Sequence, residues 1–123
     1  MTYFTKLLKA FGLVSLLVLS ACATNNKLYY WGDYEPIIYD MYANPGAADP
    51  QTQIEKLSST IQQAQNQDKQ IAPGIYAHLG MIYAQVGDMG LAKEALNEEK
   101  ALYPESAAFI DGMFSRMEKG KQP

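Results

Sequence analysis

Cys22 is the residue whose type and position point most clearly to a chemical role. It is the only cysteine in the 123-residue chain, and it follows Leu19-Ser20-Ala21 at the end of a short apolar stretch. Lys6 and Lys9 precede that stretch. A basic start followed by an apolar run too short to span a bilayer is typical of a secretory signal peptide. We therefore predict that residues 1–21 are a signal peptide, cleaved just before the thiol of Cys22.

The segment Leu19-Ser20-Ala21-Cys22 resembles the lipobox of bacterial lipoprotein precursors. The resemblance implies that the Cys22 thiol takes a diacylglycerol, that a peptidase cuts before Cys22, and that the new amine receives an acyl chain such as palmitate. We expect no cofactor besides these lipids. Each methylene buried in a bilayer contributes about 0.8 kcal/mol, so several chains would hold the protein on the membrane. An ordinary signal peptide with an incidental cysteine is the alternative.

The residues after Cys22 bear on where the anchored protein would lie. Ala23 stands where many inner-membrane lipoproteins carry aspartate, so the lipobox resemblance implies the outer membrane, with the protein facing the periplasm. Residues 22–27 form a short polar tether, which reaches roughly 20 Å at about 3.3 Å per extended residue. The folded part should therefore stay close to the membrane surface.

The charge of the mature chain disfavours nucleic acid as a partner. Removing Lys6 and Lys9 with the signal peptide changes the formal charge from −3 to −5, and the remaining sequence has no cluster of basic residues. Binding to nucleic acid depends on clustered lysine and arginine. We expect no nucleic-acid partner, contact with the membrane through the lipid anchor, and contact with other envelope proteins.

The sequence contains no pattern that predicts catalysis or a metal site. His78 is the single histidine and lacks a cysteine or a suitably spaced acidic residue in its segment, so we expect a partly exposed structural histidine. Glu94, Glu98 and Glu99 are interleaved with lysines, which is typical of a solvated helix face. We predict that the protein is not an enzyme and binds no metal.

Hydrophobic periodicity predicts one all-α domain over residues 28–123, with about five helices joined by short turns. Asp33, Asp49 and Asp88 are the expected N-caps, and Gly87 is expected in a left-handed turn. Strand-like character is confined to residues 28–31. The segments expected to be helical are 34–44, 50–68, the stretch between Pro73 and Gly87, the stretch between Asp88 and Pro104, and 105–118.

Residues 73–106 resemble one tetratricopeptide repeat, a pair of antiparallel helices. The matching positions are Tyr76, Leu79, Gly80, Tyr83, Gly87, Ala92, Leu96 and Pro104. The resemblance implies that the helices cross closely where Gly80 meets Ala92. Glu99 occupies a position where the repeat prefers a small residue, so we expect looser packing there. By the same resemblance, 34–68 is a degenerate first repeat and 105–118 a cap. A generic helical hairpin is the alternative.

Two groups of residues are candidates for partner binding. In the groove of such a repeat we expect Gly74, Ala77, Met81, Ala84 and Gln85, among which Met81 and Gln85 are the candidate contacts. The aromatic block near the start of the domain supplies Tyr30, Trp31 and Tyr34, as a partner surface or as a belt on lipid headgroups. Each group has a structural alternative, which is packing against the preceding helix or covering the open end of the helical stack.

The lipobox, the aromatic block and the repeat together resemble a family of small Gram-negative lipoproteins of unknown function, most specifically at Tyr30-Trp31-Gly32-Asp33-Tyr34. Members of that family sit beside lipoproteins related to the curli secretion channel. The resemblance implies an outer-membrane-anchored adaptor for protein–protein interaction in an envelope or secretion assembly. The alternative function is regulation of a peptidoglycan synthase or hydrolase, which the short tether disfavours.

Overall fold

The computed structural model describes residues 1–6, 27–44 and 46–120. Residues 2–6 are helical. The rest of the predicted signal peptide, Cys22 and most of the predicted tether lie outside the described residues.

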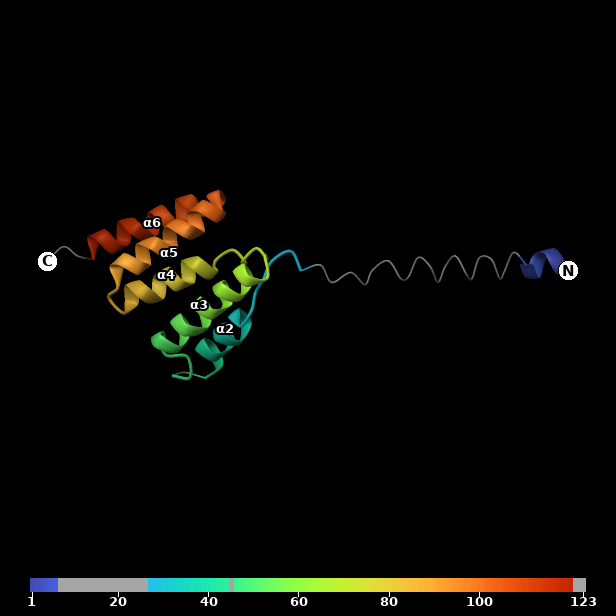
Figure 1. Ribbon diagram of the computed structural model, residues 1–123, viewed down its shortest axis with the longest axis horizontal. Coiled ribbons are helices and arrows are strands. Elements are labelled where there is room, and N and C mark those ends of the chain that lie inside the picture. Colours follow the sequence, from blue (N-terminus) through green and yellow to red (C-terminus); the bar gives the residue numbers. More distant parts are fainter. Residues whose placement is uncertain (7–26, 45, 121–123) are drawn as a thin grey trace.

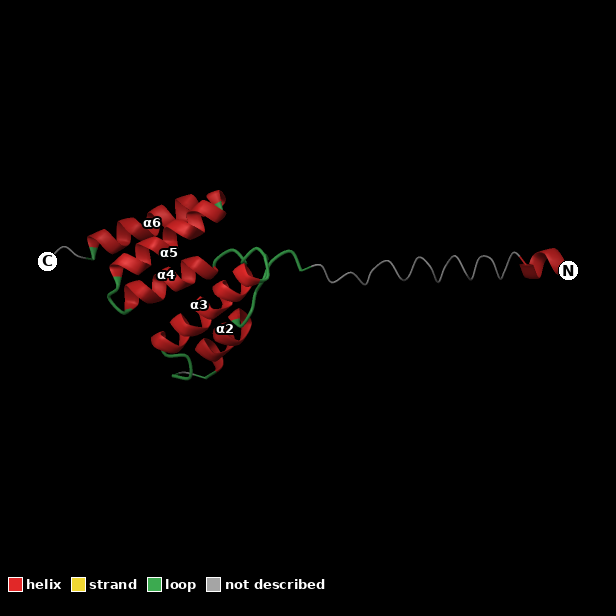
Figure 2. Cartoon of the chain, in the orientation of Figure 1, coloured by secondary structure: helices red, strands yellow, loops and turns green. Residues whose placement is uncertain are grey.

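From residue 27 onward the described chain is helical, as the periodicity predicts (Figures 1 and 2). Neighbouring helices along the chain pack against one another, and the most extensive contact is between α4 and α5. No helix in the described ranges is long and apolar enough to cross a membrane. The elements are α2 (Tyr34–Ala43), α3 (Pro50–Asn66), α4 (Ile75–Gln85), α5 (Met89–Leu102), the short 3-10 turn η2 (Pro104–Ser106) and α6 (Ala107–Lys119).

Two of the three predicted aspartate caps are present. The Asp49 carboxylate accepts hydrogen bonds from the backbone N–H groups of Gln51 (3.0 Å) and Thr52 (3.2 Å) at the start of α3. The Asp88 carboxylate accepts from the N–H of Leu91 (3.1 Å) at the start of α5. Each bond satisfies an amide that has no partner inside its own helix, so these residues fix where α3 and α5 begin.

The strand-like segment 28–31 joins the domain through a single parallel bridge between Tyr30 and Ile71. The Tyr30 N–H donates to the carbonyl of Gln70 (2.7 Å), and the Ala72 N–H donates to the carbonyl of Tyr30 (3.1 Å). The start of the domain is thereby fastened to the loop between α3 and α4, as Figure 1 shows.

The turn after this bridge requires glycine. Gly32 has φ +48°, and a Cβ added there would lie 2.5 Å from Cγ2 of Thr60 in α3. The next residue, Asp33, was expected to cap α2 with its side chain, and that prediction is wrong. Its backbone N–H instead donates to Oγ1 of Thr60 (3.3 Å), because the tight turn brings the backbone directly onto α3.

Two apolar clusters form the core. The first joins α2, α3, α4, the α3–α4 loop and one residue of α5, with Ile37, Leu57, Ile61, Ala64, Ile71, Ala72, Ile75, Leu79 and Ala95 buried. The second joins α4, α5 and α6, with Ala77, Leu96, Ile110 and Met113 buried. Helix α4 contributes to both clusters, so its position determines how the two halves of the stack meet.

Some large apolar residues near the ends of the helices are exposed instead of buried. Met41 and Tyr42 are exposed, whereas α2 packs onto α3 with Ile37 buried. Leu102 is also exposed, and the buried position at the end of α5 belongs to Tyr103. The Tyr103 hydroxyl donates a hydrogen bond to the carbonyl of Ile71, a contact across the stack that the periodicity did not indicate.

Helices α4 and α5 cross closely at Gly80, as predicted. A Cβ added to Gly80 would lie 2.7 Å from Cγ of Leu96 and 3.0 Å from the carbonyl oxygen of Ala92. Real side chains do not approach so closely, so only glycine allows this distance between the two helices. The turn that follows α4 contains Gly87 at φ +89°, again as expected.

The prediction for Glu99 is wrong. Its side chain is 2% exposed, although it was expected on a solvated face and at a loosely packed end of the hairpin. Its carboxylate accepts hydrogen bonds from the backbone N–H groups of Gly74 (2.7 Å) and Ala77 (3.3 Å) at the start of α4. Gly74 has no side chain to cap α4, and Glu99 supplies the negative charge that a helix N-terminus favours.

We expect Glu99→Gln to destabilise the domain. The glutamine side chain keeps one acceptor oxygen but loses the negative charge. Its NH2 group would face the backbone N–H group of Gly74 or Ala77, and two donors cannot form a hydrogen bond with each other. Loss of such a buried bond costs roughly 1–3 kcal/mol. Urea unfolding of the full chain should show this fall in the free energy of unfolding, whereas Glu98→Gln, at an exposed neighbouring position, should change little. Equal stability of the two variants would show that Glu99 does not hold α4.

Candidate partner-binding groove

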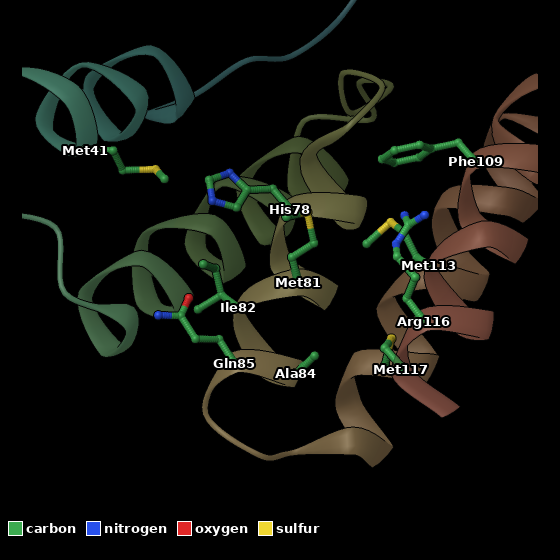
Figure 3. Close-up of a pocket in the computed structure, with 10 residues that line it drawn as sticks. All are labelled: Met41, His78, Met81, Ile82, Ala84, Gln85, Phe109, Met113, Arg116 and Met117. Carbon is green, nitrogen blue, oxygen red and sulfur yellow. The ribbon is translucent and has the colours of Figure 1, made fainter. Parts of the chain in front are cut away.

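A groove of about 660 Å³ runs along α4, with α6 on one side and the end of α2 on the other (Figure 3). Helix α4 presents residues from His78 to Gln85 to it, and α6 presents residues from Phe109 to Met117. The residues that line it are Met41, His78, Met81, Ile82, Ala84, Gln85, Phe109, Met113, Arg116 and Met117.

The lining is mostly apolar and adaptable. Four of the ten residues are methionines, whose unbranched side chains and polarisable sulfur adjust to partners of different shape. Met81 and Phe109 are 50% and 58% exposed, so large apolar groups face solvent on both walls. Exposed apolar surface gathered in a hollow is typical of a binding site for another apolar surface.

His78 lies at the floor of the groove and joins three helices. It is 9% exposed, and its Nε2 lies 3.1 Å from Oε1 of Gln53 in α3. The Tyr34 ring of α2 meets the imidazole edge-on, with 5.7 Å between ring centroids. The Nε2 of Gln53 donates to the carbonyl of Ala48 (2.6 Å), which leaves Oε1 as an acceptor and favours a proton on Nε2 of His78.

Burial keeps the groove floor uncharged. Burial lowers the pKa of His78 from its ordinary value of 6.5, because a charged imidazolium is poorly solvated there. Burial, with a smaller contribution from the charge of Glu99, raises the pKa of the Tyr34 hydroxyl. His78 is thus neutral at neutral pH, and Arg116 is the only lining residue that carries a full charge.

A family model described as a domain of unknown function, DUF4810, matches residues 28–113 of the chain. This chain belongs to the DUF4810 family. The match begins at the segment that carries the Tyr30 bridge and extends through Met113 in α6, so it includes every groove residue except Arg116 and Met117. No curated protein and no solved structure matches the chain.

Of the groove residues predicted in this DUF4810 domain, Met81, Ala84 and Gln85 line the hollow. Gly74 and Ala77 do not. The N–H of Gly74 is taken by Glu99, and the side chain of Ala77 is buried in the cluster shared with α5 and α6. Gly74 and Ala77 therefore contribute to packing within the domain, which is the structural alternative to partner binding.

The aromatic candidates do not form one surface with the groove. The Tyr30 hydroxyl donates to Oε1 of Gln63 (2.7 Å), and the Tyr34 ring packs on His78 beneath the groove. Both tyrosines pack against the first core cluster. Trp31, at 39% exposed, contacts Tyr34 at 6.0 Å between ring centroids and keeps part of its surface in solvent.

Several groove residues were not identified as binding residues from the sequence. The groove residues that were not singled out include Met41, Phe109, Met113, Arg116 and Met117. The spacing of Phe109, Met113 and Met117 at every fourth residue was a usable signal, because it places them on one face of α6. The contribution of Met41 was not visible, since it depends on how α2 lies against α4.

We expect the His78 side chain to titrate below pH 6.5 in the folded protein. As pH falls through 6.5 the unfolded chain gains this proton first, so the free energy of unfolding should fall until the folded pKa is reached. One proton corresponds to a slope of about 1.4 kcal/mol per pH unit. NMR titration of this single imidazole and unfolding curves across that range check both points.

His78→Gln is the control, because glutamine retains a hydrogen-bond donor for Gln53 but does not titrate. Its unfolding free energy should lack the His78 contribution to the slope. A folded imidazole that titrates at 6.5 or above would contradict the buried, neutral His78.

Proposed function

We propose that the protein is a lipoprotein anchored through Cys22 in the outer membrane, and that its DUF4810 domain is an adaptor for protein–protein interaction in a periplasmic envelope or secretion assembly. The observation that supports the adaptor role is the methionine-rich groove, whose lining suits the apolar face of a partner helix. The anchor is supported by the lipobox-like segment that ends at Cys22.

The dimensions of the groove fit a short helical segment. The α4 residues that line it lie within the eight-residue span from His78 to Gln85, which at about 1.5 Å per residue corresponds to roughly 12 Å, or about two turns of a partner helix. Helix-in-groove recognition uses apolar side chains repeated every three or four residues, and the methionines on both walls would pack between them. Arg116 on the α6 wall would pair with an acidic residue of that helix.

The order of the helices supports a tetratricopeptide-like scaffold for this role. Helices α2 and α3 form one pair and α4 and α5 the next, with α6 following. The groove is lined by α2, α4 and α6, which are the first helix of each pair and the final helix. Such scaffolds bind different partners along one face without catalysis, which agrees with an adaptor.

In vivo photocrosslinking tests the groove. A photoreactive residue at Met81 of the full-length chain should give discrete crosslinked products with envelope proteins. The same residue at Lys93, an exposed position outside the groove, should not give them. The products from Met81 should disappear when Phe109→Glu places a charge on the opposite wall, because Phe109 is exposed and its replacement leaves the core intact.

Identical products from Met81 and Lys93, or products that survive Phe109→Glu, would contradict binding in the groove. The lipid anchor is tested separately, in the same cells, with the variant Cys22→Ser. This variant should lose palmitate labelling and accumulate as an uncleaved precursor. Normal labelling of Cys22→Ser would contradict the lipobox.

A further inference from the structure

Trp31 is the one aromatic residue of the segment Tyr30-Trp31-Gly32-Asp33-Tyr34 that the burial pattern leaves exposed. Tyr30 bonds Gln63, the backbone at Gly32 and Asp33 lies against α3, and Tyr34 packs on His78. The Trp31 ring is 39% exposed. Close by in the chain, Leu28 is 76% exposed. Packing of the domain therefore does not explain why two large apolar side chains stand at this edge.

A hollow of about 220 Å³ adjoins Trp31 and combines aromatic walls with cationic side chains. Lys27 and Lys69 both line it, and the Lys69 Nζ lies 5.7 Å from the centre of the Tyr30 ring. Glu35 is the single carboxylate of the lining. Two ammonium groups beside exposed tryptophan and leucine fit the layered chemistry of a lipid interface, where phosphates lie just outside the acyl chains.

The position of this edge in the fold agrees with that chemistry. The chain from Cys22 enters the domain at Lys27, and the bridge to Ile71 places the α3–α4 loop with Lys69 at the same end (Figure 1). Only residues 23–27 separate Cys22 from Leu28, a reach of roughly 20 Å when extended. A lipid on Cys22 would therefore hold this end of the domain next to the bilayer.

We propose that Lys27, Leu28, Trp31 and Lys69, here called the entry surface, rest on the phospholipid interface. The Trp31 and Leu28 side chains enter the headgroup layer, and Lys27 and Lys69 contact phosphates. The inference rests on the proposed anchor at Cys22, because the anchor provides the proximity that the small entry surface alone does not. It fixes the orientation of the domain, with the α4–α5 turn directed away from the bilayer.

Fluorescence of Trp31 tests this contact, since it is the only tryptophan in the chain. The mature lipidated protein is reconstituted into vesicles of phosphatidylcholine and phosphatidylglycerol whose acyl chains carry bromine, a contact quencher. Trp31 emission should shift to shorter wavelength and lose most of its intensity relative to unbrominated vesicles. The double variant Lys27→Gln/Lys69→Gln should reduce this quenching without changing how much protein stays with the vesicles.

The matched control moves the fluorophore to the other end of α2. In Trp31→Phe/Tyr42→Trp the indole replaces a side chain that is 81% exposed, and its emission should not respond to bromine. Equal quenching at both positions, or no quenching at Trp31 in protein that floats with vesicles, would overturn the orientation and leave the anchor intact.

Two further outcomes are distinguishable. Protein that does not float with vesicles would overturn the anchor and, with it, this inference. A blue shift at Trp31 that grows with protein concentration and ignores bromine would show contact with a second copy of the chain, and would also overturn the lipid assignment.

Discussion

The close approach of α4 and α5 at Gly80 is the constraint on which the rest of the fold depends. The Gly80 backbone lies against Leu96 and the carbonyl of Ala92, with no room for a side chain. Helix α4 belongs to both core clusters, so the separation of α4 and α5 also sets how α3 and α6 meet it. With the Gly80 side of α4 turned towards α5, Met81 and Gln85 are left facing the groove.

Hydrogen bonds from buried polar groups hold α4 in position along its neighbours. Glu99 binds the amides at the start of α4, and His78 binds Gln53 of α3. Among the described residues no buried side-chain nitrogen or oxygen lacks a hydrogen-bond partner. A shift of α4 along α5 would leave the Glu99 carboxylate or the amides unpaired, and such groups are costly to bury. These polar contacts thus specify the register at which the groove is assembled.

Most of the helical architecture could be predicted from the sequence, because local signals determine it. The caps at Asp49 and Asp88, the left-handed Gly87 and the close crossing at Gly80 follow from residue types at fixed spacing. Glu99 could not be predicted, since its partners lie 25 and 22 residues away. The prediction of a partly exposed His78 is also wrong, because His78 is buried by residues of α2 and α3 that the local sequence of α4 does not reveal. The groove was predictable on the α4 wall alone, and its other walls depend on tertiary packing.

The two proposed contacts, with the membrane and with a partner helix, lie in different parts of the domain. The entry surface lies where the chain arrives from Cys22, and the groove runs along α4 towards the α4–α5 turn. A partner helix would therefore lie on α4, whose separation from α5 is set by Gly80. The adaptor role and the membrane orientation are separate claims, but both need α4 to be held rigidly between its neighbours.

The most direct measurement compares Gly80→Ala with Gly112→Ala in the full chain by urea unfolding. Both replace glycine within a helix, which by propensity gains up to about 1 kcal/mol. The Gly112 Cβ would meet only the end of the flexible Arg116 side chain, at 3.6 Å. We predict that Gly112→Ala is neutral or stabilising, whereas Gly80→Ala lowers the free energy of unfolding by about 1–3 kcal/mol through overpacking. An equal gain in both variants would contradict the close crossing of α4 and α5.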